Sequence, residues 1–231
     1  MLPIRDDQVR YSTPWVTWFL IGLNLVIFLM ESALDSRSLN LVIHQFGVVP
    51  YHTAAFLAGS SRYPLPVVVL PFFTSMFLHA SWMHVIGNMW FLYIFGDNVE
   101  DWLGHFKYLV FYLLTGLIAM LTQVAINLHS TVPSVGASGA IAGVLGAYFV
   151  LFPRARVLTW FFVFVLWVPA WIILGYWFVL NFLSGTASSL AVRGQNMGGV
   201  AFWAHVGGFA SGALLVKLFG ERQRRYPYAY Q

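Results

Sequence analysis

Six long apolar stretches constrain the fold of this 231-residue chain more than any other feature. A helix needs about 20 mostly apolar residues, within a range of roughly 17 to 25, to cross the hydrocarbon core of a bilayer. The stretches cover approximately residues 15–30, 72–95, 106–128, 135–152, 157–183 and 200–219. We therefore expect an all-α polytopic membrane protein with six transmembrane helices.

Composition supports a membrane protein and excludes several other classes. Hydrophobic residues make up 59% of the chain and charged residues 9%, whereas ordinary soluble domains are about 25% charged. The net charge of +4 does not indicate nucleic-acid binding, because the basic residues are scattered except in the C-terminal tail. The absence of cysteine excludes disulfides, a thiolate nucleophile and cysteine-ligated metal sites.

The apolar stretches form one membrane domain. We expect a cytoplasmic tail at 1–14, the six-span domain at 15–219 and a second cytoplasmic tail at 220–231. The segment 31–71 contains four prolines and is too broken to form a further spanning helix. The Gly- and Ser-rich connection 184–199 is predicted to be a flexible loop.

The basic residues predict the orientation, because cytoplasmic loops carry an excess of Lys and Arg. With both termini inside, nine basic residues lie on the inner side and three on the outer side. The outer three are Arg37, Arg62 and Arg193, and the inner nine are Arg5, Arg10, Lys107, Arg154, Arg156, Lys217, Arg222, Arg224 and Arg225. The asymmetry favours an N-in, C-in arrangement.

Three polar motifs begin the second, fourth and sixth spans. They are His84 with Asn88, Ser138 within Gly-Ala-Ser-Gly, and His205. Polar residues inside a membrane are costly and are functional candidates by default. Because these three spans run in the same direction, the motifs are expected at a similar depth near the outer face.

These residue types match the chemistry of acyl transfer. A serine hydroxyl becomes a nucleophile when a neutral imidazole accepts its proton, so His205 is the candidate base for Ser138. The acidic residues lie mostly in tails and inner loops, which predicts a dyad without a carboxylate. His84 and Asn88 lie four residues apart on one helical face and can donate to an oxyanion. Gly136 and Gly139 are expected to contact substrate, because the glycines let the backbone of this turn approach it closely.

Small residues at four-residue spacing predict how the two catalytic helices meet. Gly139, Gly143 and Ala147 follow Ser138, and Ala204, Gly208 and Gly212 flank His205. Such stripes allow close helix packing in lipid. If the stripes face each other, Ser138 and His205 can come within about 3 Å.

Each motif also has a structural reading. Ser138 could bond a backbone carbonyl, and His84 with Asn88 could form a polar clamp between helices. His79 could organise the outer loop. Asp97, Glu100 and Asp101 are interpreted as a solvated inner loop, with Glu100 alternatively bracing neighbouring helices. The conjunction of the three motifs on one membrane face favours the catalytic interpretation.

At these motifs the sequence resembles the rhomboid family of intramembrane serine proteases, in particular bacterial members with a six-helix core. The matching segments are FGVVP at 46–50, TSMFLHASWMHVIGN at 74–88, FGDNVEDWLG at 95–104, SVGASGAIAGVLGAY at 134–148 and AHVGGFASG at 204–212. The resemblance implies Ser138 as nucleophile, His205 as base, and His84 with Asn88 as oxyanion donors. Ala142 stands where some members carry a tyrosine stacked on the catalytic histidine.

The resemblance also implies a substrate and a location. It predicts cleavage of single-pass membrane proteins in or near their transmembrane segments, by an enzyme that lies in a bacterial inner membrane and needs no cofactor or metal. The main alternative is a rhomboid-like protein that binds membrane clients without cleaving them. A small transporter would require paired intramembrane charges or repeated halves, which the sequence lacks.

Overall fold

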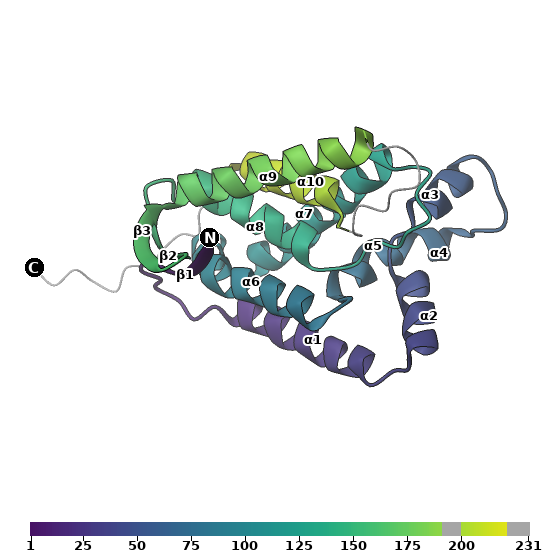
Figure 1. Cartoon of the computed structure of the whole chain (residues 1–231), viewed down its shortest axis with the longest axis horizontal. Helices are drawn as coiled ribbons and strands as arrows, with labels where there is room; N and C mark the ends of the chain where they lie inside the picture. The colour runs from purple at the N-terminus through teal and green to yellow at the C-terminus, as the bar shows by residue number, and fades with distance from the viewer. Residues whose placement is uncertain (191–199, 221–231) are drawn as a thin grey trace, which may run out of the picture.

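The computed structural model describes residues 1–190 and 200–220, and this part of the chain is mostly helical (Figure 1). Its elements are, in order, β1 (Leu2–Asp6), α1 (Trp15–Ser32), α2 (Ser36–Phe46), α3 (Pro50–Leu57), α4 (Leu65–Val69), α5 (Pro71–Thr74), the 3-10 helix η1 (Ser75–Phe77), α6 (Trp82–Leu103), α7 (His105–Ile126), α8 (Ser138–Leu151), β2 (Arg156–Phe161), β3 (Phe164–Pro169), α9 (Ala170–Leu190) and α10 (Phe202–Phe219). The later part of the predicted 184–199 loop and the tail from 221 onward lie outside the described residues.

Four of the described helices are long and apolar enough to cross a membrane: α1, α7, α9 and α10. A fifth candidate is the pair Leu65–Phe77 and Trp82–Leu103, which bends by 76° at a short break. The sequence predicted this region as one stretch, but Ser81 begins α6 afresh by accepting a hydrogen bond from the His84 backbone. All six apolar stretches contain helix, but six complete crossings are not established.

Helix α8 forms the centre of the bundle, with α6 on one side and α9 and α10 on the other (Figure 1). Every residue from Gly139 to Tyr148 is buried. At 14 residues the helix is about 21 Å long, shorter than the hydrocarbon core. Gly208 lies directly on the Gly139 carbonyl, and Gly212 lies on that of Gly143. The predicted facing of the two small-residue stripes is confirmed.

The prediction of a span over 157–183 is wrong at both ends. Residues Arg156–Phe161 and Phe164–Pro169 pair as an antiparallel hairpin, and α9 runs from Ala170 to Leu190. The hairpin is rich in aromatic and β-branched residues, which favour strands, but an apolar run alone does not distinguish a strand from a helix. Residues 184–190, predicted as loop, therefore extend the helix.

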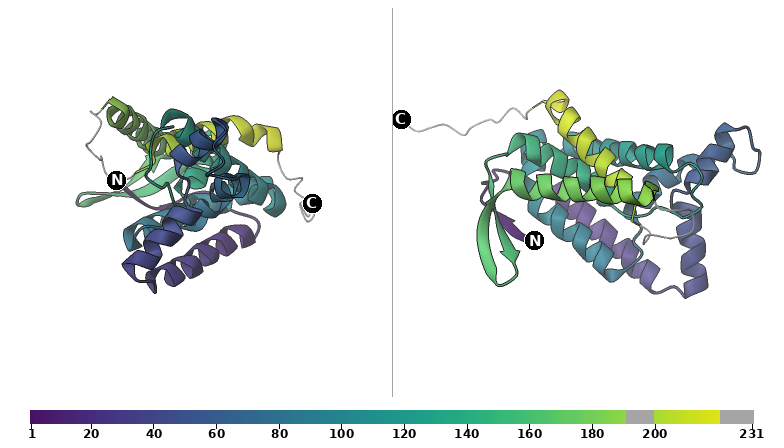
Figure 2. Two further views of the ribbon diagram at one scale, coloured as in Figure 1. Left: turned by 90° about the vertical axis from the view of Figure 1, so that its right-hand side faces the viewer. Right: turned by 45° about the horizontal axis from the view of Figure 1, so that its top comes forward.

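The N-terminal segment is a strand rather than a simple tail. Strand β1 pairs antiparallel with β2, giving a three-stranded sheet in the order β1-β2-β3 at one end of the bundle (Figure 2). The Asp6 carboxylate accepts hydrogen bonds from the Tyr148 hydroxyl at 2.5 Å and from the Asn98 amide at 2.8 Å. Burial raises the pKa of Asp6. The strand is thus fixed to α6 and α8.

The acidic group predicted as a solvated inner loop lies in the last turns of α6. Glu100 is fully buried and accepts hydrogen bonds from the backbones of Val16 and Thr17, at 2.9 and 2.7 Å. Its carboxylate therefore satisfies free N–H groups at the start of α1. The alternative that Glu100 braces neighbouring helices is confirmed.

The proline-rich segment after α1 folds into short helices, and none of them is long enough to span, as expected. Asp35 caps α2 by accepting hydrogen bonds from the backbones of Arg37 and Ser38. These bonds and one from the Ser38 hydroxyl lower the pKa of Asp35. Val48 then pairs with Ser134, which ties the segment to the loop before α8.

The strand β1 and the end of α10 lie at the same end of the bundle. The Lys107 ammonium at the start of α7 donates to the Phe219 carbonyl at 2.7 Å. The start of α1 is bonded to Glu100 at the end of α6, which directly precedes α7. Both described chain ends thus share one side, opposite to the end where α8 begins.

Candidate active site

Ser138 is the first residue of α8 and follows a turn that requires glycine. Gly136 has φ +124°, a conformation that L side chains rarely adopt, and its N–H donates to the Ser75 carbonyl at 2.8 Å. A Cβ at this position would also lie 2.7 Å from the His84 ring. The turn therefore brings the start of α8 against His84, and it leaves the first N–H groups of the helix available.

His205 lies in the first turn of α10, with its Nε2 atom 2.8 Å from the Ser138 hydroxyl oxygen. Its Nδ1 atom is 2.6 Å from Oδ1 of Asn181 on α9. An amide oxygen can only accept, so Nδ1 carries the ring proton and Nε2 presents its lone pair to Ser138. This is the protonation pattern that a general base needs.

Asn181 and Trp177 are site residues that the sequence reasoning missed. Both lie on α9, four residues apart, and the Trp177 ring is 5.5 Å from the His205 ring at an interplanar angle of 38°. Trp177 thus contacts the histidine in a chain that has Ala142 at the position expected to hold a tyrosine in some family members. A lone asparagine within an apolar span was a usable signal, because intramembrane polar groups are functional candidates.

His84 and Asn88 lie on α6 and line a pocket of about 700 Å³ together with Ser138 and His205. The predicted convergence of these four side chains is thus seen in the geometry. The pocket wall also includes residues of α2 and of the segment before α10. A smaller cavity of about 230 Å³ is lined by the same four residues and extends between α6, α8 and α9.

His79 supports Asn88 from behind. Its Nε2 atom lies 2.9 Å from the Asn88 amide nitrogen, and its ring is 5.1 Å from that of His84. Its own backbone N–H donates to the Glu31 carboxylate at 3.1 Å. The ring is almost fully buried, so His79 organises the polar residues of α6 rather than an exposed loop.

The two glycines predicted to contact substrate have different surroundings. Gly136 lies beside the His84 ring and Ser138, as described above. Gly139 faces Ala119 of α7 and Ala204 of α10, where a Cβ would lie 2.8 Å from the Ala119 side chain. Gly139 therefore serves helix packing in this structure, and contact of either glycine with substrate stays a prediction.

Comparison with known protein families shows to which family this chain belongs. The model of the rhomboid domain family matches residues 68–222, about two thirds of the sequence. The chain belongs to the rhomboid family. The match covers α6 to α10, and so includes Ser138, His205, His84, Asn88 and Asn181.

Several curated rhomboid proteins are similar to this chain. Rhomboid-like protein 11, chloroplastic, of Arabidopsis thaliana is 35% identical over 155 residues, covering 65% of this chain and 52% of that protein. Rhomboid protein 1, mitochondrial, of Saccharomyces cerevisiae is 33% identical over 144 residues, covering 61% and 39%. The human Presenilin-associated rhomboid-like protein, mitochondrial, is 28% identical over 152 residues, covering 62% and 36%. The chain thus spans about half or less of the relatives' length.

The family and the relatives support only part of the expected location. Family membership and the spanning helices make this rhomboid protein a multi-pass integral membrane protein. The similar proteins are named for chloroplasts and mitochondria. They give no support to the prediction of a bacterial type or of a bacterial inner membrane.

Proposed function

We propose that this rhomboid-family chain is an intramembrane serine endopeptidase that hydrolyses peptide bonds in or near transmembrane segments of single-pass membrane proteins. The observation that carries the proposal is the 2.8 Å contact between the Ser138 hydroxyl and His205 Nε2 inside a pocket. The family consists generally of intramembrane serine proteases, which agrees with this geometry.

In the proposed reaction Ser138 attacks the scissile carbonyl carbon while His205 Nε2 accepts the hydroxyl proton. The Asn181 oxygen stabilises the resulting imidazolium, because Nδ1–H already donates to it at 2.6 Å. His205 then gives its proton to the leaving amine. In the second half, a water molecule attacks the acyl carbon while His205 accepts its proton, and the bond to Ser138 Oγ then breaks as His205 returns that proton to the serine oxygen.

The negative charge that develops on the substrate oxygen is proposed to be bound by His84 and Asn88. Both side chains face the same pocket as Ser138. The His79 ring next to Asn88 holds that amide in place at 2.9 Å. The Ser138 N–H at the start of α8 is a further donor, and each such donor is typically worth about 3 kcal/mol.

The two cavities suit a membrane-bound substrate. A helix hides its carbonyls in hydrogen bonds, so a substrate must unwind locally before Ser138 can attack. The smaller cavity has apolar walls that include Phe91 and Leu145, while the larger one contains the polar groups. We infer that an unwound segment enters past α6 and α9 and that water arrives through the larger pocket.

The proposed topology places six crossings in the bilayer, with α8 as the short central one. Both chain ends face the cytoplasm and the pocket opens to the other side. The shared side of β1 and the end of α10 supports an even number of crossings. The excess of basic residues on that side supports its cytoplasmic placement.

The proposal is tested with purified protein in liposomes and a single-pass model substrate. Ser138→Ala should abolish cleavage without changing thermal stability, and a metal chelator should have no effect. Ser134→Ala is the matched control, since Ser134 is buried in the same loop but does not line the pocket. Full cleavage by the Ser138→Ala protein would refute the mechanism.

Chemical labelling separates an enzyme from a protein that only binds clients. A serine-directed fluorophosphonate should modify Ser138, identified by mass spectrometry, and His205→Ala should reduce this labelling strongly. A protein that retains the model substrate, cleaves none of it and leaves Ser138 unmodified would be a binding protein instead.

A further inference from the structure

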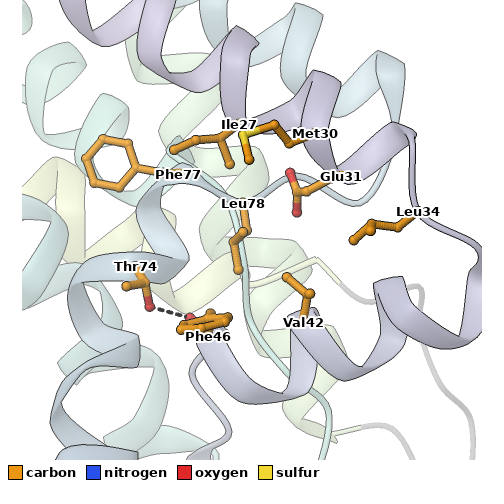
Figure 3. Close-up of a pocket in the computed structure, with 9 residues that line it drawn as sticks. All are labelled: Ile27, Met30, Glu31, Leu34, Val42, Phe46, Thr74, Phe77 and Leu78. Atoms are coloured by element: carbon orange, nitrogen blue, oxygen red, sulfur yellow. Dashed lines mark hydrogen bonds between the residues drawn. The ribbon is translucent and has the colours of Figure 1, made fainter.

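A third cavity, of about 390 Å³, lies between α1, α2 and the turn that includes η1 (Figure 3). Its lining is almost entirely apolar and shares no residue with the catalytic pocket. The lining residues are Ile27, Met30, Glu31, Leu34, Val42, Phe46, Thr74, Phe77 and Leu78. A cavity of this size falls in the range of about 300 to 1,000 Å³ that is typical of small-molecule sites.

Glu31 places a carboxylate in this apolar wall. The residue is 3% exposed, and Figure 3 shows its carboxyl group projecting from α1 into the space between Leu78 and Val42. One oxygen accepts from the His79 backbone, but the other has no hydrogen-bond partner among the described residues. The nearby Thr74 hydroxyl already donates to the Phe46 carbonyl at 2.7 Å. A buried acceptor without a donor is costly, so the wall lacks a complementary group.

We propose that this cavity binds a single-chain amphiphile whose head is a primary ammonium and whose hydrocarbon chain fills the apolar walls. The ammonium would donate to the free Glu31 oxygen and offset its charge. A carboxylate or phosphate head would instead be repelled by Glu31 and would find no cation in the lining. An uncharged alcohol can donate one hydrogen bond but leaves the charge unbalanced, so it should bind less tightly.

Two structural elements connect the cavity to the catalytic pocket. The first is the chain of contacts from Glu31 to the His79 backbone and from the His79 ring to Asn88. The second is α2, whose Val42 lines the cavity while Ile43 lines the catalytic pocket. Helix α2 has no fully buried residue, so it is held weakly. A ligand in the cavity should therefore displace α2, which forms one wall of the catalytic pocket, and Asn88, the proposed oxyanion donor. An effect of this displacement on cleavage rests on the proposed function.

Binding is tested by photolabelling, which does not depend on proteolysis. The probe is decylamine with a diazirine in its chain, added to the 231-residue protein in phosphatidylcholine nanodiscs, with labelled peptides identified by mass spectrometry. Labelling should concentrate on residues 27–34, which cover the last turns of α1 and the start of the connection after it, and on residues 42–46 of α2. Unlabelled decylamine should compete at least five-fold better than decanol, and decanoate should not compete.

Four variants locate the site. Val42→Phe fills the cavity and should reduce labelling at least five-fold, while Leu41→Phe, on the exposed side of α2, should leave it unchanged. Glu31→Gln should remove the preference for the amine over the alcohol. If Val42→Phe unfolds α2, Leu34→Phe fills the same cavity from the connection between α1 and α2. Labelling spread evenly over lipid-facing helices, or unaffected by either filling variant, would overturn the proposal.

The regulatory consequence has its own readout. Decylamine should change the rate of substrate cleavage by at least two-fold in the wild-type protein and not in Val42→Phe. Site-specific labelling with an unchanged cleavage rate would overturn the coupling but not the binding. A protein that shows the labelling and never cleaves substrate would refute the proposed function and leave the cavity assignment intact.

Discussion

Substituting Gly212 tests whether the α8–α10 contact positions the catalytic pair. An added Cβ at Gly212 would overlap the Gly143 carbonyl, and the obstacle is backbone rather than a side chain that can rotate away. Relieving such an overlap requires the two helices to separate by about 1 Å or more. Ser138 and His205 lie on these same helices and are 2.8 Å apart, so they must separate too.

The magnitude of the Gly212→Ala effect follows from two opposing terms. Alanine favours a helix over glycine by about 1 kcal/mol. Overpacking typically costs about 1 to 3 kcal/mol, and the upper value applies here because backbone meets backbone. We expect a net loss of about 2 kcal/mol in the free energy of unfolding. Cleavage should fall about 100-fold, the usual effect of a 1 Å displacement at a reacting centre.

The assay compares thermal unfolding and cleavage of a model substrate for Gly212→Ala and a matched control. Gly22 lies within α1, and a Cβ there would meet nothing within 4 Å, so Gly22→Ala should keep full activity and stability. A Gly212→Ala protein with wild-type stability and activity would show that the close contact does not position the dyad. Loss of both properties in the Gly22→Ala protein would show that glycine content matters generally.

Three further predictions concern polar contacts. Asn181→Leu removes the acceptor of the His205 Nδ1–H group and should lower kcat at least about ten-fold. Asn181→Asp retains an acceptor and should keep more activity. Equal cleavage rates for the two variants would exclude a positioning role. Burial raises the pKa of Asp6, so this carboxyl group stabilises the folded state fully at pH values below its ordinary pKa of 3.8, and the stabilisation is lost as the pH rises through the raised pKa. Asp6→Asn should therefore weaken the pH dependence of thermal stability. An unchanged pH profile would contradict this assignment. Asp35→Ala removes the cap of α2 and should speed amide hydrogen exchange over Ser36–Phe46. Asp35→Asn keeps a capping oxygen and should preserve protection from exchange. Identical exchange rates in the two variants would show that the cap is dispensable.

The sequence predicted the helical frame and the facing of α8 and α10 because these follow from local patterns. Apolar length marks spans, and glycines at four-residue spacing mark close contacts. The contact of Gly212 with Gly143 agrees with that reasoning. The sequence reasoning also predicted that Ser138 and His205 lie on facing helices. The observed 2.8 Å between Ser138 Oγ and His205 Nε2 is the distance that a nucleophile and its base require.

The hairpin and the acids of α6 were missed for a different reason. Residues 157–169 are apolar, and hydropathy does not state whether a run satisfies its backbone within a helix or with another strand. One partner of β2 is β1, which lies more than 150 residues earlier at Leu2↔Trp160. Likewise Glu100 looks solvated in sequence because its partners, Val16 and Thr17, are 84 and 83 residues away.

Asn181 shows how the two ends of the molecule are connected. The helix that carries it begins directly after β3, and the sheet that holds β3 is fixed through Asp6 to Tyr148 of α8. The same α8 begins with Ser138. One end of α9 is therefore tied to α8 through the sheet, and its middle is tied to α10 through His205. Helix α9 also packs on α10 through its aromatic residues, with the Phe178 ring 4.9 Å from the Phe209 ring, so polar contacts and apolar packing together hold the acceptor against the catalytic ring.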